Sequence, residues 1–327
     1  MPMSASPVRY LDIRVITRLK LEEVPPNQVQ KYWMHIISNG LGQPVYLPLI
    51  VLRGSEPGPV VGITAGVHGN ELNGVPVVQQ TFQRIDPTAL RGTLIGVPVV
   101  NVLSLLSHER RFLDGEDLNR IMPGKTRGNR SQIYAYRFVR RIIQELDYLI
   151  DLHTASNGRI NSHYIRADMR RKTTAKLAEL QNPQIILNNA GADGTLRSAA
   201  ADLGIHAITV EIGDPNLFQE KMIGYGLEGV FNVLYHLKML EGEVKPPQQT
   251  PVRCRKSYWM YADRGGIMEV FPEVTEAVEK GQRIALIRDV FGELIKEFHA
   301  PEDGIVIGRS VSPVNQTGGR ILHLGIR

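Results

Sequence analysis

Two histidines and a glutamate stand where apolar, strand-like runs end. In GITAGVHGNELNG (residues 62–74) the run stops at His68, and Glu71 follows three residues later. In YLIDLHTAS (148–156) a second run ends at His153. Because the carboxyl ends of adjacent strands in an open α/β sheet border one crevice, we expect the three side chains to converge. Two histidines and one carboxylate form a catalytic zinc set that leaves a position for water.

A third apolar run ends in a carboxylate. Glu211 lies in HAITVEIGDP, where a buried carboxylate without a partner would be costly. Activated water needs a proton acceptor that is not itself a metal ligand. Glu211 is therefore predicted to be the general base and, later, the general acid toward a leaving amine. The alternative, a carboxylate that caps a helix or pairs with a surface arginine, stays open.

The stretch HERRFLDGEDLNR (108–120) is predicted to be a polar, arginine-rich turn between a strand and a helix. Arginine presents a planar fork to a carboxylate and stabilises charge that develops on a carbonyl oxygen. Asp117 could accept a hydrogen bond from a ligand histidine and fix its tautomer. A single arginine in such a turn could equally be a solvated surface residue.

Short β-branched runs alternate with helical patterns from about residue 45 to 240, which predicts an α/β fold: a mixed sheet with helices on both faces. Several runs are apolar on both faces, as covered central strands are. The first 40 residues are expected to add strands at the sheet edge. The predicted strands are 45–54, 59–66, 92–101, 147–154, 162–168 and 204–213, and the predicted helices are about 73–85, 131–146, 170–181, 195–203 and 219–240.

The character of the chain changes after a proline-rich segment. We predict a catalytic domain over residues 1–243, a linker over 244–253, and a smaller all-β, barrel-like domain over 254–327. The last range holds short strands separated by glycine-containing turns and shows almost no helical periodicity.

Composition narrows the class of protein. The 327 residues are 43% hydrophobic and 22% charged, as in soluble globular proteins. No run is long enough for a membrane span, and the start lacks the pattern of a secretory signal. The single cysteine, Cys254, agrees with a reducing cytoplasm, so a cytoplasmic protein is expected. A net charge of only +5, without zinc-finger spacing or an aromatic-rich strand motif, argues against nucleic-acid binding.

Four motifs in a fixed order carry a resemblance to a known family. GVHGNE, DLNR, DLH and VEIG, spread over about residues 58–240, resemble those of the succinylglutamate desuccinylase/aspartoacylase family, a branch of the zinc carboxypeptidase-like superfamily. The resemblance implies one zinc ion (Zn2+) per chain, bound by His68, Glu71 and His153. It also implies Glu211 as the catalytic acid and base.

The same resemblance implies roles for five further residues. Asn119 and Arg120 would hold the substrate carboxylate, and Arg111 would polarise the scissile carbonyl. Asp117 would be the partner of a zinc histidine. Arg197 stands where family members can carry a substrate-binding arginine, and an arginine on the surface of a helix is the equal alternative.

The last part of the chain resembles the β-rich domain of this family, which is related to biotinyl and lipoyl carrier barrels. The hairpin APEDGIVIG lacks the modifiable lysine of a carrier, so we expect a structural domain or a wall over the site. In some relatives a tyrosine from this part reaches the substrate. Tyr258 and Tyr261 are the candidates here, but core packing is the favoured role for both.

The leading expectation is zinc-dependent hydrolysis of the amide of a small N-acyl amino acid or related amine, with no nucleic-acid or membrane partner. A metallocarboxypeptidase or amidase for short peptides is the first alternative. A non-catalytic binding protein on the same fold is the second. The arginines at 110, 111 and 197 would suit an acidic acyl chain or acidic amino acid, whereas some relatives remove acetyl groups from diamino acids. A homo-oligomer is compatible with the sequence.

Overall fold

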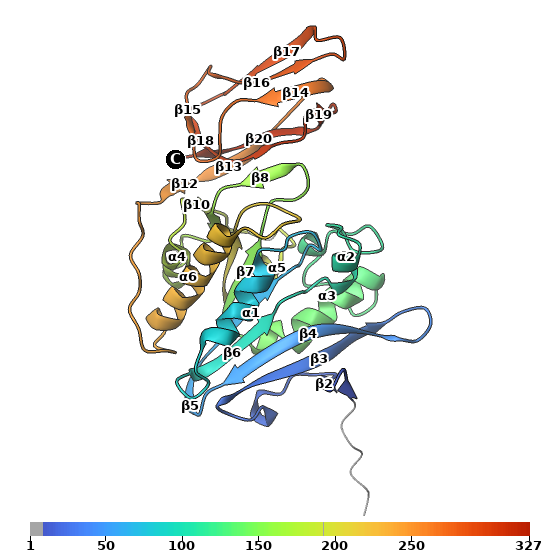
Figure 1. The fold of residues 1–327 in the computed structure, drawn as a ribbon, viewed down its shortest axis with the longest axis vertical. Helices are drawn as coiled ribbons and strands as arrows, with labels where there is room; N and C mark the ends of the chain where they lie inside the picture. Colours follow the sequence, from blue (N-terminus) through green and yellow to red (C-terminus); the bar gives the residue numbers. More distant parts are fainter. Residues whose placement is uncertain (1–8, 192) are drawn as a thin grey trace, which may run out of the picture.

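Within residues 9–191 and 193–327, which the computed structural model describes, eleven strands form one large mixed sheet in the order β1-β2-β3-β4-β6-β5-β7-β11-β9-β10-β12 (Figure 1). The predicted first domain and the start of the chain include residues 1–8, which lie outside the described residues. The strands are β1 (Arg9–Tyr10), β2 (Ile13–Ile16), β3 (Gln28–Ser38), β4 (Pro44–Arg53), β5 (Glu56–Ala65), β6 (Arg91–Val97), β7 (Tyr148–His153), β9 (Tyr164–Ala167), β10 (Ile185–Asn188), β11 (His206–Glu211) and β12 (Val252–Cys254).

The centre of the sheet is parallel. β7 pairs in parallel with β5 on one side and with β11 on the other. All three are almost entirely buried toward their carboxyl ends, as their apolar sequences predict. The predicted strands before residue 40 are confirmed as β1, β2 and β3 at one edge of the sheet. The three strand ends that carry the candidate site therefore lie next to one another.

Helices cover both faces of the sheet, which confirms the predicted mixed α/β architecture. Side chains of α3 and α5 pack into one core with β3 and β4, whereas side chains of α1, α4 and α6 pack into a second core with β5 and β11. The helices are α1 (Gly74–Arg84), α2 (Val102–Leu106), α3 (Arg130–Arg141), α4 (Lys172–Leu180), α5 (Leu196–Asp202) and α6 (Glu220–His236). The single turns are η1 (Leu21–Glu23), η2 (Leu118–Arg120) and η3 (Ile143–Glu145). Among the described helices, none is long and apolar enough to cross a membrane.

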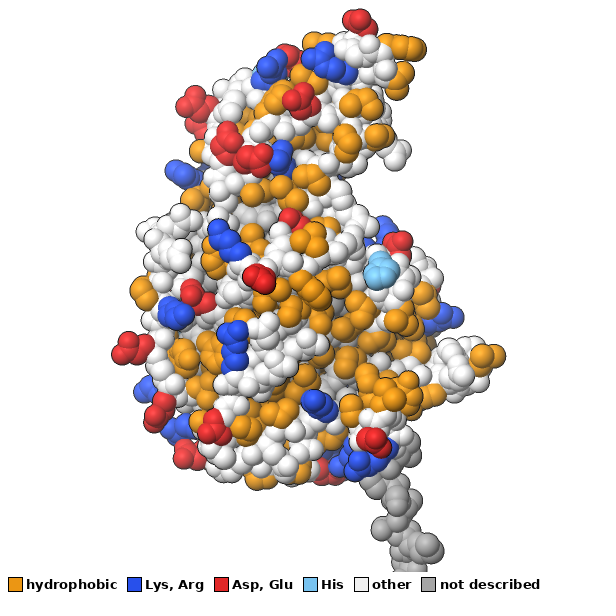
Figure 2. Space-filling view, in the orientation of Figure 1, with side chains coloured by type: hydrophobic (Ala, Val, Ile, Leu, Met, Phe, Trp, Pro, Cys, Tyr) orange, Lys and Arg blue, Asp and Glu red, His pale blue; other side chains and the backbone are white. Residues whose placement is uncertain are grey.

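The C-terminal part forms two small, mainly antiparallel sheets around its own apolar core, which confirms the all-β prediction. It stands as a separate lobe above the larger body in Figures 1 and 2. The strands are β13 (Lys256–Tyr261), β14 (Gly266–Val270), β15 (Ala277–Val278), β16 (Arg283–Arg288), β17 (Leu294–His299), β18 (Gly304–Ser310), β19 (Val314–Asn315) and β20 (Arg320–Ile326).

The two parts of the chain exchange strands where they meet. β8 (Arg159–Asn161) follows β7 but pairs with β18 of the C-terminal sheet, at the base of the upper lobe in Figure 1. In the other direction, β12 lies partly in the predicted linker 244–253 and pairs in parallel with β10 of the large sheet. Because each part holds a strand of the other, backbone hydrogen bonds fix the C-terminal sheet beside the strand ends of the larger one.

Candidate active site

The turn after β5 brings His68 and Glu71 to the end of the sheet. Gly66 has a φ of +61°, a conformation that favours glycine. At Gly69 a β-carbon would lie 2.1 Å from the backbone carbonyl carbon of Ser104, so a side chain there would displace α2. The two glycines thus let the chain turn sharply against α2 before α1 begins.

His68, Glu71 and His153 come together in one buried cluster. One potential ligand atom from each lies within 4.8 Å of the other two, and each side chain is at most 3% exposed. His68 Nδ1 is 2.8 Å from Glu71 Oε1, and His153 Nδ1 is 2.9 Å from Glu71 Oε2. The predicted convergence of His68 and Glu71 with the chain-distant His153 is present, and their donor types are those of a zinc site.

Each histidine ring is held from its outer side by a carboxylate. Asp117 Oδ1 lies 3.0 Å from His68 Nε2, and Asp151 Oδ2 lies 2.8 Å from His153 Nε2. Thr64 Oγ1 donates to the other Asp151 oxygen at 2.7 Å. Such carboxylate contacts fix the tautomer and leave both Nδ1 atoms to face Glu71.

The contact of Asp117 with a ligand histidine is predicted from the sequence, whereas that of Asp151 is not. The signal was present in DLH, because residues two apart in a strand share a face. Asp151 and His153 occupy these positions in β7.

Replacing Asp151 with asparagine is expected to weaken zinc binding about 10- to 100-fold, the usual effect of removing the outer partner of a ligand histidine. The variant amide can still accept a hydrogen bond, but it lacks the charge that supports ligand basicity. Competition with a chromophoric zinc chelator measures the change. Asp202→Asn, at the exposed end of α5, is the control and should bind zinc as the wild type does. Equal affinity in both variants would contradict this role of Asp151.

The charges in the cluster favour an ionised Glu71. Burial alone would raise the pKa of Glu71, but the adjacent His68 and His153 outweigh it and hold that pKa well below its usual range. Burial likewise opposes ionisation of Asp117, yet His68 and Arg110 lower the pKa of its carboxyl. Both carboxylates are therefore available to a cation and its ligands at neutral pH.

Glu211 lies beside this cluster. It ends β11 opposite His153 in the parallel register, and both residues line the same cavity. Asn161 Nδ2 donates to Glu211 Oε2 at 3.1 Å, and Arg166 Nε lies 3.9 Å from Oε1. Burial raises the pKa of Glu211, the charge of His153 offsets part of that effect, and Glu71 adds to it. The raised pKa suits a group that must take up and release a proton.

The structure brings Arg110, rather than Arg111, to the cluster. Arg110 Nη1 lies 2.8 Å from Glu71 Oε1 and 3.3 Å from His68 Nδ1, and it also contacts Ser156 Oγ. Its other nitrogens donate to Asp117. Arg111 is exposed at the rim of the cavity, where Nη1 donates to the Gly115 carbonyl oxygen at 2.7 Å. The side chains of these two adjacent arginines thus point in different directions, that of Arg110 into the cluster and that of Arg111 toward solvent.

Asn119 and Arg120, in η2, line the cavity as expected. Asn119 Oδ1 accepts from the Leu196 backbone N–H at 2.8 Å, so its Nδ2 group is left to donate. Arg120 Nη1 donates to the Asn119 carbonyl oxygen at 2.8 Å. Arg197 also lines the cavity, but both of its Nη groups contact Asn189 or Asp193.

The cavity that holds the cluster has a volume of about 540 Å³ and contains side chains from both parts of the chain. The C-terminal part contributes Trp259 and Arg320. Tyr258 instead packs toward the C-terminal core and donates to Glu302, and Tyr261 is 54% exposed and does not line the cavity. Core packing, the favoured role, is therefore confirmed for Tyr258 but not for Tyr261. A register shift in β13 between Trp259 and Tyr261 separates two side chains that strict alternation would place on one face, and it is Trp259 that lines the cavity.

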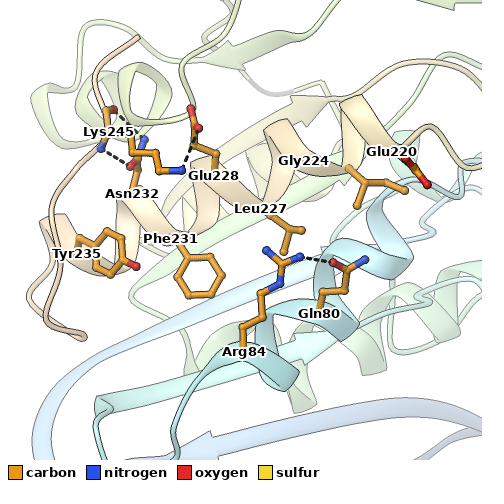
Figure 3. A pocket seen from close by; sticks show the side chains of 11 residues that line it. Gln80, Arg84, Glu220, Gly224, Leu227, Glu228, Phe231, Asn232, Tyr235 and Lys245 are labelled. Atoms are coloured by element: carbon orange, nitrogen blue, oxygen red, sulfur yellow. Dashed lines mark hydrogen bonds and ion pairs between the residues drawn. The ribbon is translucent and has the colours of Figure 1, made fainter. Parts of the chain in front are cut away.

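A second hollow, of about 680 Å³, lies between α1 and α6 (Figure 3). Several of its polar groups pair with one another: Arg84 Nη2 donates to Gln80 at 2.7 Å, and the Lys245 backbone N–H donates to Asn232 at 2.9 Å. None of its residues belongs to the histidine cluster. Despite its larger volume, it offers no convergent set of acids, bases and ligands.

Fold and cluster together define an α/β protein with a candidate metal centre at the carboxyl ends of parallel strands. The chain belongs to the succinylglutamate desuccinylase/aspartoacylase family, since residues 57–237 match the family model "Succinylglutamate desuccinylase/Aspartoacylase catalytic domain". All four motifs singled out in the sequence lie within this range.

Similar proteins extend the comparison beyond the catalytic domain. The N-alpha-acetyl-L-2,4-diaminobutyric acid deacetylase of Halomonas elongata is 26% identical over 280 residues, which cover 81% of each chain. The crystal structure of a succinylglutamate desuccinylase/aspartoacylase from Rhodobacter sphaeroides has a TM-score of 0.83 at 24% identity, and covers 93% of this chain and 98% of its own. The product-bound ectoine utilization protein EutE (DoeB) from Ruegeria pomeroyi has a TM-score of 0.85 at 20% identity with the same coverage. The two structures share the fold of this chain.

Proposed function

We propose that this protein is a zinc-dependent deacylase that hydrolyses the amide bond of a small N-acyl amino acid. The observation that carries the proposal is the cluster of His68, Glu71 and His153 beside Glu211 in one cavity. A curated relative that covers 81% of the chain is a deacetylase, which supports the reaction class.

His68 Nδ1, His153 Nδ1 and a Glu71 oxygen would hold one zinc ion. The outer nitrogens already contact Asp117 and Asp151, so the donor set fits a zinc carboxypeptidase-like centre. When bound, zinc would act as a Lewis acid that makes water more acidic and polarises a carbonyl group. Arg110 Nη1 lies against two of these donors, so it would have to move away from Glu71 to make room.

The protein's own groups supply the proton transfers. Glu211 would accept a proton from the attacking water and return it to the leaving nitrogen, so that one carboxyl serves first as base and then as acid. Asn161 and Arg166 orient this carboxyl. Arg110 would stabilise the charge that develops on the carbonyl oxygen, the role that the resemblance gave to Arg111.

A free carboxylate on the amino acid half would bind at η2. Asn119 Nδ2 can donate to one oxygen, and Arg120 adds a positive charge at the same wall of the cavity. Arg197 is proposed to shape this wall through Asn189 and Asp193 rather than to bind the substrate.

A small substrate fits the site better than a peptide. Trp259 and Arg320 of the C-terminal part line the same cavity as the candidate zinc ligands, so the upper lobe acts as a wall over the site. An extended peptide would need an open groove at this position. We therefore place peptide hydrolysis second.

The test is a panel of N-acetyl, N-succinyl and N-formyl amino acids and short peptides, scored for released amine with and without added zinc. We expect at least one N-acyl amino acid to be hydrolysed, chelation to abolish turnover, and zinc to restore it. Turnover of peptides alone would favour the carboxypeptidase alternative. No stoichiometric zinc and no restored turnover of any amide would favour a non-catalytic binding protein.

A further inference from the structure

The side chain that donates to the proposed base comes from a strand that the C-terminal sheet holds. Asn161 is 8% exposed, and its Nδ2 group donates to Glu211 Oε2 at 3.1 Å. Its strand, β8, pairs with β18 and not with the large sheet, and Asn161 lies opposite Gly308 in that pairing. The position of this donor therefore depends on the C-terminal sheet, whereas Glu211 itself belongs to the large one.

Gly308 leaves the space that the Asn161 side chain occupies. A β-carbon at Gly308 would overlap Asn161 Oδ1 and would lie 2.9 Å from the carbonyl oxygen of Ile160. A glycine inside a strand commonly marks a place where another part of the chain approaches closely. Here the approaching group is the amide of Asn161, so any larger residue at position 308 would push that amide from its place beside the base.

A β-bulge next to Gly308 fixes the other side of the same loop. The pairing of β18 with β20 shifts between Val306 and Gly308, so Ile307 is the extra residue. The Ile307 carbonyl oxygen accepts from the Ser162 backbone N–H at 3.0 Å and from Ser162 Oγ at 2.9 Å. Because Ser162 follows Asn161 directly, β18 holds the backbone on both sides of the Asn161 side chain.

The same strand supports the second group that contacts Glu211. Arg166 Nε lies 3.9 Å from Glu211 Oε1, and Arg166 Nη2 donates to the Tyr164 hydroxyl group at 2.9 Å. Tyr164 lies opposite Glu211 in the pairing of β9 with β11, and it packs with Ile305 and Ile307 of β18 in one apolar cluster. The two side chains that orient the Glu211 carboxyl are thus both supported from β18.

We propose that Gly308 is a positioning residue: by leaving room for Asn161, it lets the C-terminal sheet set the orientation of the Glu211 carboxyl. This inference rests on the proposed deacylase function and adds that the upper lobe holds the base as well as forming a wall. A general base transfers a proton only at hydrogen-bond distance and in the right direction. A displaced carboxyl should therefore lower kcat more than it affects substrate binding.

Gly308→Ala is expected to lower kcat about tenfold, the scale of one lost hydrogen bond to a charged group, because the added methyl group pushes Asn161 away from Glu211. KM should change by less than about threefold, and the protein should still bind one zinc ion. The control is Gly304→Ala in the same strand, where the added β-carbon would lie 2.7 Å from the Gly325 carbonyl oxygen and would not meet β8. Gly304→Ala should keep the wild-type kcat even if its melting temperature falls. Equal losses of kcat in both glycine variants would overturn the proposal.

A double-mutant cycle shows whether Gly308 acts through Asn161. Asn161→Ala should lower kcat by about the same factor as Gly308→Ala, since both remove the same hydrogen bond. Adding Gly308→Ala to Asn161→Ala should then lower kcat by less than about twofold further, because the group that the methyl would displace is gone. Losses that multiply would contradict this role. If Gly308→Ala alone does not fold, the double variant should fold, and an equally unfolded double variant would also contradict it.

Crystal structures decide the link without turnover. In Gly308→Ala, Asn161 Nδ2 should no longer lie within hydrogen-bond distance of Glu211 Oε2, whereas Gly304→Ala should keep this contact. An unchanged contact in Gly308→Ala would overturn the positioning role. If no amide is hydrolysed by the wild type, the deacylase proposal fails, and this structural comparison still decides whether Gly308 positions Asn161 and Glu211.

Discussion

Replacing Glu211 with glutamine is expected to lower kcat by about a hundredfold or more while the protein still binds one zinc ion. Glutamine preserves the shape of the side chain and can keep the contact with Asn161, but it cannot take up a proton. Glu211 is not part of the three-residue ligand cluster, so metal content should not change. Steady-state kinetics on the best substrate of the panel, together with metal analysis of the same sample, measure both quantities.

A second carboxylate in the cavity provides the control. Glu116 lines the same cavity but lies outside the ligand cluster, so Glu116→Gln removes an equal charge without removing the proposed base. Its kcat should stay within about threefold of the wild type, as expected for a charge that takes no part in proton transfer. Near-native turnover of Glu211→Gln would exclude Glu211 from the acid and base role, whatever Glu116→Gln does.

The pH dependence provides an independent measurement of the same group. Burial raises the pKa of Glu211, and the base form is the unprotonated one. As the pH falls through this raised pKa, Glu211 becomes protonated and kcat/KM should fall, at a pH above the usual range of a glutamate near 4.3. In the Glu211→Gln variant, the residual kcat/KM should not show this fall at low pH. An identical fall of kcat/KM in the variant would mean that another group titrates in this pH range.

Much of the site could be predicted because its key residues end buried strands. A run such as YLIDLHT, which is mostly apolar on both faces, predicts a strand covered by helices, and the polar residues that end it then lie at the carboxyl end of the sheet. This reasoning placed His153 and Glu211 correctly at the ends of β7 and β11. The prediction did not require the strand order, because the carboxyl ends of neighbouring parallel strands border the same crevice.

Residues whose role depends on side-chain direction were harder to predict. In β13, alternation requires Tyr258 and Trp259 to face opposite sides, but the sequence does not say which side faces the cavity. The answer depends on the register with β20, which is set by backbone pairing across the C-terminal sheet. The contribution of β8 to that sheet was missed for a related reason, since strand exchange between two parts of a chain leaves no local pattern.

The two adjacent arginines show the same limit in a turn. A resemblance matches motifs along the chain and carries no information on side-chain direction. It can therefore assign the role to Arg111 when the adjacent Arg110 is the residue that faces the site. The direction of each side chain follows instead from backbone angles such as the φ of +55° at His108, which no residue type specifies. In the folded chain Arg110 enters the buried cluster, and Arg111 folds back onto the Gly115 carbonyl group.

Arg110→Gln is accordingly expected to lower kcat/KM by about 100- to 1,000-fold, the usual loss when one donor to a developing oxyanion is removed. Arg111→Gln should change it by less than about threefold, because its loss removes one exposed hydrogen bond at the cavity rim. The two variants differ by one position in the chain and remove the same charge, so each is the control for the other. Kinetics on one substrate at saturating zinc provide the comparison.

Zinc binding separates a catalytic role of Arg110 from a structural one. Arg110 Nη1 lies 2.8 Å from Glu71 Oε1, so its positive charge competes with any cation at that oxygen. Arg110→Gln should therefore bind zinc at least as tightly as the wild type while it loses turnover. If Arg110 served only to hold the cluster together, the variant would lose zinc and turnover in parallel. A large kinetic loss in Arg111→Gln with normal turnover in Arg110→Gln would instead mean that the loop rearranges around the substrate and delivers the outer arginine to the carbonyl group.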